Sequence, residues 1–150
     1  MSLPLQFAVM AKQTFSIAFG GYWREPNISG VPSHSGVYCV YTCTHNIEAN
    51  NLTLHRLIYI GEAGDVNSRL ANHEGWDAWK TYLKQGQVLC VSTAPAESAS
   101  RVRIEAACIK YHQPPSNTEY KDAFPHDETT VTTSGENIFL APCFTVQRQD

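Results

Sequence analysis

The sequence lacks any hydrophobic run long enough to cross a membrane. Its longest apolar runs, VYCVY at 37–41 and LIYIG at 57–61, are far shorter than the roughly 20 residues of a membrane-spanning helix. Hydrophobic residues make up 43% of the chain and charged residues 17%, which is the balance of an ordinary folded domain. The first residues, MSLPLQFAVMAKQTF, lack the basic start and long apolar core of a signal peptide. We therefore expect a protein with no membrane partner.

Cysteine spacing of the kind that builds a disulfide framework is also lacking. The five cysteines are an odd number, spread along the chain as Cys39, Cys43, Cys90, Cys108 and Cys143. Without a signal peptide, such residues are typical of free, mostly buried thiols in a reducing compartment. The sequence thus predicts a cytoplasmic location.

An excess of positive charge, common in nucleic-acid binders, is the third missing feature. The chain has 11 Lys and Arg residues against 14 Asp and Glu residues, a formal net charge of −3 at pH 7. This sum does not exclude a local basic face, because only charges within about 8–10 Å of a phosphate act on it strongly. Nucleic acid therefore stays open as a partner.

The pattern of apolar residues predicts one domain over residues 1–150, without repeats or linkers. The predicted strands are 35–42, 54–62 and 87–93, with a possible C-terminal hairpin of 129–133 and 137–146; the predicted helices are 65–74, 76–86 and 93–113, with a short one at 6–12. This order indicates an α+β fold, in which a small, largely antiparallel three-stranded central sheet is flanked by helices. Residues 35–117 would form the core, between an N-terminal extension (1–34) and a C-terminal extension (118–150).

Polar side chains occupy notable positions on these predicted elements. Tyr38 and Tyr59 lie on the two strands of the first predicted hairpin. Arg69 and His73 are four residues apart, so a helix would place both on one face. Glu105 lies among alanines and isoleucines in the middle of the longest predicted helix. A carboxylate is costly there unless it is solvated, paired or bound to a metal.

The order of these residues resembles the GIY-YIG nuclease domain. The matching stretches are GVY at 36–38, YIG at 59–61, the Arg69–His73 pair, IEAACI around Glu105 and PPSN ending at Asn117. The 20 residues between the two tripeptides exceed the roughly ten of the commonest family form and are closer to its restriction-endonuclease-like branch. The resemblance implies a metal-dependent endonuclease that hydrolyses nucleic-acid phosphodiester bonds, with DNA as the expected substrate.

The resemblance also implies roles for the charged and phenolic residues. Glu105 would hold one Mg²⁺, for which Mn²⁺ would substitute. Arg69 would face the scissile phosphate, which suits the planar fork of its guanidinium. Tyr38 would orient or deprotonate the attacking water, and Tyr59 would hydrogen-bond into the same cluster.

Four further positions follow from the same resemblance. His73 would accept a proton, since its ordinary pKa lies near working pH. Asn117 would orient the water or phosphate network. Gly36 and Gly61 would be the glycines of the two motif tripeptides.

Additional cations are candidates for contacts along a nucleic-acid backbone. They are Lys80, Lys84, Arg101, Arg103 and Lys110. Exposed helix lysines are equally typical of solubility alone, so this interpretation stays open.

Other sites are less well supported by the residue pattern. Cys108 and His112 could form half a zinc site, but no second pair completes it. Cys39, Cys43 and His45 straddle a strand and its loop, which is poor spacing for a metal cluster. Trp76 and Trp79 could stack on bases, although their spacing of three favours packing in a helix core.

Two alternatives to an active nuclease remain. One is a nucleic-acid-binding module that keeps the fold without useful catalysis, and it would bind in a salt-sensitive, metal-independent way. The other is a protein-interaction domain that uses the same site as a pocket, which the acidic charge balance would suit.

Overall fold

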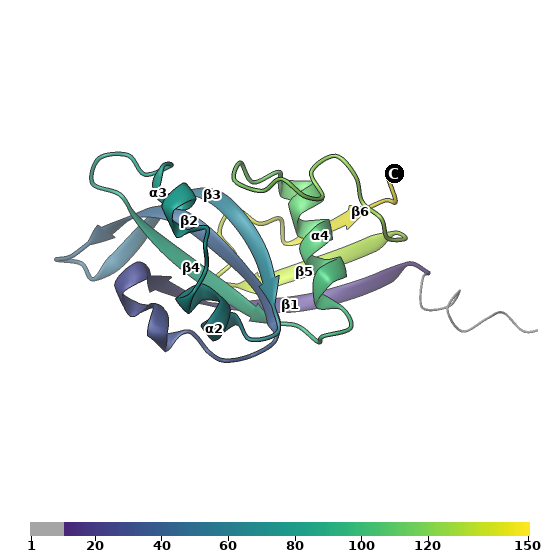
Figure 1. Cartoon of the computed structure of the whole chain (residues 1–150), viewed down its shortest axis with the longest axis horizontal. Coiled ribbons are helices and arrows are strands. Elements are labelled where there is room, and N and C mark those ends of the chain that lie inside the picture. The colour runs from purple at the N-terminus through teal and green to yellow at the C-terminus, as the bar shows by residue number, and fades with distance from the viewer. Residues whose placement is uncertain (1–10) are drawn as a thin grey trace, which may run out of the picture.

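The computed structural model describes residues 11–150, which form one mixed six-stranded sheet with helices on it (Figure 1). The strands are β1 (Gln13–Arg24), β2 (Gly36–Asn46), β3 (Asn51–Ala63), β4 (Val88–Pro95), β5 (Thr129–Gly135) and β6 (Cys143–Val146). Their order is β3-β2-β4-β1-β5-β6, and only the β1–β5 pair is parallel. The predicted three-stranded central sheet flanked by helices is therefore wrong. The three predicted strands do exist, as the adjacent antiparallel strands β3, β2 and β4.

The missed strand β1 is the reason why the sheet is larger than predicted. Residues 13–24 fall in the predicted N-terminal extension, yet they form a strand that pairs with β4 on one side and β5 on the other. The partner strand β5 lies more than 100 residues further along the chain, so no local pattern reveals the pairing. The expected C-terminal hairpin is present as β5 and β6, and β1 joins it to the same sheet. The short helix predicted at 6–12 lies largely outside the described residues.

The helices are shorter than the sequence predicts. They are η1 (Glu25–Gly30), α2 (Val66–Ala71), α3 (Trp76–Lys80) and α4 (Arg101–His112). The predicted start of the long helix at residue 93 is wrong, because residues 88–95 are strand β4 and its buried side chains fill both faces of the sheet. The helix ends before Pro114, as predicted, with Gln113 in the left-handed conformation. Asp65 caps α2 by accepting a hydrogen bond from the Ser68 N–H at 3.2 Å.

Strand β2 is buried on both faces and separates two hydrophobic layers. Val37, Cys39 and Tyr41 pack in the layer that contains the apolar residues of α4. Tyr38 and Val40 pack in the opposite layer, with the apolar residues of α2 and α3. The edge strand β3 runs alongside both layers, so groups from either side of the sheet can meet there (Figure 1).

The outer edge of β3 is covered by the loop that follows α4. The Ser116 N–H donates to the Ile58 carbonyl at 2.9 Å. The Asn117 side chain accepts from the Ile60 N–H at 2.9 Å and donates to the Ile60 carbonyl at 2.8 Å, as a paired strand would. These contacts protect the exposed strand edge and fix the C-terminal end of α4 against β3.

Within residues 11–150, no helix is both long and apolar enough to cross a lipid bilayer.

A half-buried histidine joins α4 to the C-terminal region. The His112 Nδ1–H donates to the Cys108 carbonyl at 2.8 Å, and Nε2 accepts from the Ala141 N–H at 2.9 Å. This arrangement requires the neutral imidazole, and burial lowers the His112 pKa. His112 also has both ring nitrogens occupied by backbone groups, so it is not available to a zinc ion with Cys108.

We predict that His112 makes the fold less stable in acid. Its folded-state pKa is lower than the unfolded value of about 6.5, so the unfolded chain binds the extra proton. Its contribution to stability is therefore complete above pH 6.5 and is lost as the pH falls below that value. Urea unfolding between pH 7.5 and 5 gives the free energy of unfolding as a function of pH. For His112→Gln this free energy should change less steeply with pH than for wild type, by up to about 1.4 kcal/mol per pH unit. Equal slopes would contradict this role, because His73 and His126, whose pKa values are also lowered, are retained in both proteins.

Candidate active site

The two motif glycines are needed where backbone and side chains approach closely. A Cβ at Gly61 would lie 2.3 Å from Cζ and 2.4 Å from the hydroxyl oxygen of Tyr38. The register places Tyr38 directly opposite Gly61, so the phenol of β2 extends across the glycine of β3. A Cβ at Gly36 would lie 2.1 Å from the Ala94 carbonyl of β4. The glycine of YIG thus makes room for the tyrosine of GVY.

Tyr38 belongs to an aromatic cluster on one side of β3. Its ring centroid lies 6.2 Å from that of Tyr59 and 6.0 Å from that of His73. His73 lies 5.7 Å from Tyr59 and 4.5 Å from Trp79. Trp79 is buried and packs with Trp76 at 4.9 Å, so the tryptophans form a helix core as predicted.

His73 enters this cluster from a loop and not from a helix. Helix α2 ends at Ala71, so the predicted helical face shared by Arg69 and His73 is wrong. The imidazole is instead held by the Gly75 N–H, which donates to Nδ1 at 2.8 Å. In the neutral ring the proton therefore lies on Nε2, which is buried and has no hydrogen-bond partner among the described residues.

This arrangement changes the chemistry that His73 can perform. Burial and the nearby Arg69 charge lower its pKa, so the ring is neutral at pH 7. Its available group is then an Nε2–H donor, and not the proton acceptor expected from the sequence. A buried donor without a partner is costly, and a ligand with an acceptor oxygen would satisfy it.

Glu105 approaches from α4, on the other side of β3. It shares a cavity of about 180 Å³ with Tyr59, Asn117 and Glu119. Burial raises the Glu105 pKa to about 8, and the negative charges of Glu62 and Glu119 add to the shift. The Glu105 charge also raises the pKa values of Tyr59 and Tyr38, so it lies within electrostatic reach of both phenols.

Arg69 lies beside the phenols but already holds an anion. Its Nη1 and Nη2 donate to the two carboxylate oxygens of Glu74, both at 2.8 Å. The guanidinium charge opposes the increase in the pKa values of Tyr38 and Tyr59, which places it near both hydroxyls. Arg69 in turn lowers the Glu74 pKa to about 2. Arg69 is therefore placed beside the phenols and paired with a carboxylate, and its role as a phosphate ligand stays a prediction.

Asn117 has a structural role in this arrangement. Both ends of its amide are bonded to the Ile60 peptide, so they are not free to orient a water or a phosphate as expected. Because this bond ties the loop after α4 to the strand that carries Tyr59, Asn117 fixes the opening between Tyr59 and Glu105. It is a positioning residue.

The predicted backbone cations do not form one face. Lys80 pairs with Glu25 at 3.1 Å, and Lys84 is exposed on the loop after α3. Lys110 is half-buried near the end of α4. Only Arg101 is near the site, because it shares an open groove with Arg69.

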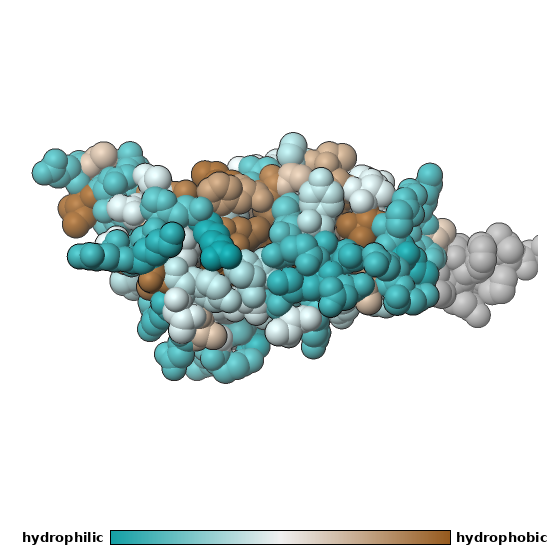
Figure 2. All heavy atoms as spheres, turned by 90° about the horizontal axis from the view of Figure 1, so that it is seen from above, coloured by the Kyte–Doolittle hydropathy of each residue, from teal (hydrophilic) through white to brown (hydrophobic). Residues whose placement is uncertain are grey.

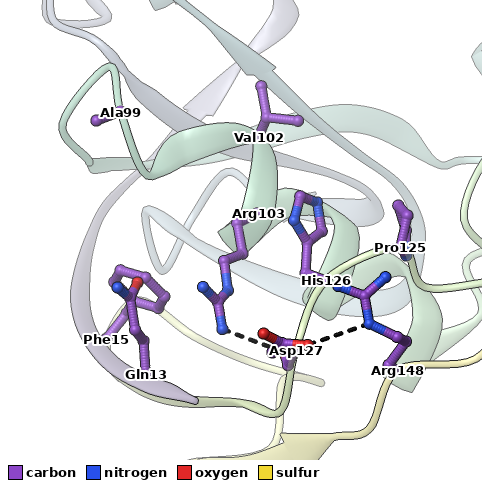
Figure 3. A pocket seen from close by; sticks show the side chains of 9 residues that line it. All are labelled: Gln13, Phe15, Ala99, Val102, Arg103, Pro125, His126, Asp127 and Arg148. Carbon is purple, nitrogen blue, oxygen red and sulfur yellow. Dashed lines mark hydrogen bonds and ion pairs between the residues drawn. The ribbon is translucent and has the colours of Figure 1, made fainter. Parts of the chain in front are cut away.

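Arg103 is mostly buried and donates to protein groups, which does not favour the predicted nucleic-acid contact for this residue. It reaches from α4 toward Asp127, and Arg148 approaches Asp127 from the other side (Figure 3). Its Nε donates to the Thr129 hydroxyl at 2.8 Å, and its Nη2 donates to the Asp127 and Glu128 carbonyls at 3.1 Å. Arg103 therefore secures the start of β5.

The surroundings of Glu105 fit a hard divalent cation. Three carboxylates, those of Glu105, Glu62 and Glu119, interact electrostatically, and the unfavourable charge on Glu105 would be offset by a cation. Among residues 11–150, no group of three or more His, Cys, Asp or Glu side chains is arranged to enclose a metal. A cation on Glu105 would therefore complete its shell with water and phosphate oxygens, which is how Mg²⁺ is usually bound.

Two acidic residues of the site were missed from the sequence. Glu62 follows YIG directly and pairs with Arg101, while Glu74 follows His73 and pairs with Arg69. Their positions directly after Gly61 and His73 are the one feature of the sequence that indicates a place in the site. The pairings themselves depend on loop geometry and on contacts far apart in sequence, which residue spacing does not reveal.

Comparisons with protein-family models, with curated proteins and with solved structures give no significant match to this chain. Its function must therefore be inferred from the chemistry of the site.

We predict that Gly61→Ala destabilises the protein by about 1–3 kcal/mol, since the new methyl group would overlap the Tyr38 ring. Gly64→Ala is the matched control, because a Cβ there would be 3.7 Å from its nearest neighbour on Arg101. Urea unfolding of both variants measures the difference. Equal stability of the two variants would show that Tyr38 does not lie over Gly61.

We also predict that Glu105→Gln stabilises the protein in alkaline solution. The folded-state pKa of about 8 exceeds the unfolded value of about 4.3, so the acid form stabilises the fold and this benefit is lost as the pH rises through 8. At pH 9 the variant should gain about 1 kcal/mol or more, roughly 2–4 °C in Tm, and at pH 4 little or nothing. Glu97→Gln, at an exposed position, serves as the control. A variant less stable than wild type at pH 9 would contradict a costly charge at this half-buried position.

Proposed function

We propose that this protein is a divalent-metal-dependent endonuclease of the GIY-YIG type that hydrolyses phosphodiester bonds, with DNA as the expected substrate. The observation that carries the proposal is the position of Glu105. A carboxylate with a strongly raised pKa lines the same cavity as Tyr59 and acts electrostatically on Tyr38, while Arg69 lies beside both phenols. Perturbed acids in such a cavity are typical of functional sites.

The protein groups match the needs of phosphodiester hydrolysis. Arg69 supplies a planar cation for the negative charge that develops on the phosphate. Both tyrosine pKa values are raised, so Tyr38 and Tyr59 remain neutral and act by orienting a water molecule through their hydroxyls. The Nε2–H of His73 would donate to an oxygen of the bound substrate or water. Mg²⁺ bound at Glu105 would supply Lewis-acid stabilisation of the phosphate oxygens.

A nucleic-acid-binding module without useful catalysis is the second candidate. The observation that favours it is the Arg69–Glu74 ion pair, because the cation expected at the phosphate is already neutralised. A protein-interaction domain has less support. Among residues 11–150, the exposed large hydrophobic side chains are divided between α4 and two separate loops; they are Ile47, Val102, Tyr111, Ile138 and Phe139. The face seen in Figure 2 is mostly hydrophilic, with separate hydrophobic patches between the polar residues.

Cleavage of plasmid DNA tests the proposal. We expect wild type to cut with Mg²⁺ or Mn²⁺, and Glu105→Ala and Tyr38→Phe to lose about 10²-fold or more in rate. Tyr111→Phe, at an exposed position outside the cavity, is the control and should cut like wild type. Equal cutting by wild type and Glu105→Ala, or no cutting of any DNA or RNA substrate by wild type, would rule out an active nuclease. Salt-sensitive binding without cutting would favour the binding module.

A further inference from the structure

We infer that the groove between Arg69 and Arg101 binds phosphate groups, and that the carboxylate of Glu74 occupies the binding edge of Arg69 until a phosphate displaces it. The identification of the natural ligand as a nucleic-acid backbone rests on the proposed function. The groove itself, about 480 Å³ in volume, extends from Arg69 on α2 to Arg101 at the start of α4.

The Arg69–Glu74 pair has the geometry of a bound oxyanion. Two parallel N–H donors of the guanidinium meet two oxygens of the carboxylate, both at 2.8 Å. A phosphodiester presents two non-bridging oxygens to the same fork, so it and the carboxylate compete for the same donors. One cannot bind in this way while the other is in place.

Exposure determines which carboxylate can leave. The Glu74 side chain is 74% exposed, and its partner Arg69 is 38% exposed. Glu74 can therefore exchange its ion pair for water at little cost, as is usual for surface ion pairs. Arg69 remains in the groove beside the phenols.

Arg101 differs from Arg69 in how firmly its partner is held. The Arg101 and Glu62 side chains are 23% and 26% exposed, and Arg101 also donates from Nη1 to the Ser35 hydroxyl at 3.2 Å. Its remaining Nη2 lies beside Gly64, which lines the groove. Glu62 thus orients Arg101, whereas Glu74 covers the working edge of Arg69.

The Arg69–Glu74 ion pair could instead serve only to hold Arg69 in position. The two roles predict opposite effects when Glu74 is neutralised. A covering carboxylate weakens phosphate binding, so its removal strengthens binding. A supporting carboxylate orients the arginine, so its removal weakens binding.

Glu74→Gln distinguishes them. Fluorescence anisotropy with a short labelled DNA duplex in EDTA measures binding without cleavage. We expect Glu74→Gln to bind about tenfold more tightly than wild type, as one competing charge-assisted pair is lost. Glu48→Gln changes the net charge equally on the exposed β2–β3 turn and should have a much smaller effect. In the Arg69→Ala background, Glu74→Gln should give no gain. A gain no larger than that of Glu48→Gln, or weaker binding, would overturn the inference.

A titration with inorganic phosphate separates this inference from the proposed function. If no variant binds the duplex, phosphate should still raise the Tm of Glu74→Gln more than that of wild type. That result would keep the covered phosphate site and reject nucleic acid as its ligand. No difference between the two proteins in either assay would overturn the inference itself.

Discussion

The structure depends most on the placement of one unfavourable charge, the Glu105 carboxylate in the middle of α4. Its neighbours on the helix, Ile104, Ala106 and Ala107, are buried in the hydrophobic layer, and its own pKa is raised to about 8. A helix that served only to cover the sheet would be more stable with an uncharged residue there. The ionised carboxylate is therefore costly at this position, which is the reason why we propose that a cation binds there.

The edge strand β3 lies between the Glu105 carboxylate on α4 and the aromatic cluster, and it carries Tyr59. Tyr59 lies on this strand and contacts both the Glu105 cavity on one side and the His73–Trp79 cluster on the other. Two local devices maintain the arrangement. Gly61 leaves space for the Tyr38 ring, and the Asn117 amide ties the end of α4 to the backbone of β3. Tyr38, Tyr59 and Glu105 thus lie on regular elements, which hold side chains more accurately than loops do, whereas His73 is placed by a loop.

The sequence predicted the parts of the fold that depend on local pattern. Strands β2, β3 and β4 were found because β-branched and aromatic residues form clear runs, and α4 because it ends at a double proline. Strand β1 was missed because its partners are distant and its sequence is interrupted by glycines, with an irregular register after Gly21. The six-stranded sheet therefore could not be obtained from the sequence, even though its central three strands could.

The candidate site shows the same division. Tyr38, Tyr59, Arg69, His73 and Glu105 were singled out from sequence order, and the structure places them around one edge of the sheet. The chemical role of each side chain was harder to predict from the sequence. His73 is a donor because the Gly75 N–H occupies Nδ1, and Arg103 is buried by contacts with β5. Such roles follow from hydrogen-bond partners, and spacing along the chain does not specify these.

The most direct test of a cation site at Glu105 is anomalous diffraction from crystals soaked in Mn²⁺ above pH 8, where the carboxylate is ionised. An anomalous peak within coordination distance of the Glu105 carboxylate, facing Tyr59 and absent from Glu105→Gln crystals, is the predicted result. A Mn²⁺ ion bound elsewhere, or a Glu105 side chain without a cation at saturating Mn²⁺, would contradict the role assigned to this residue.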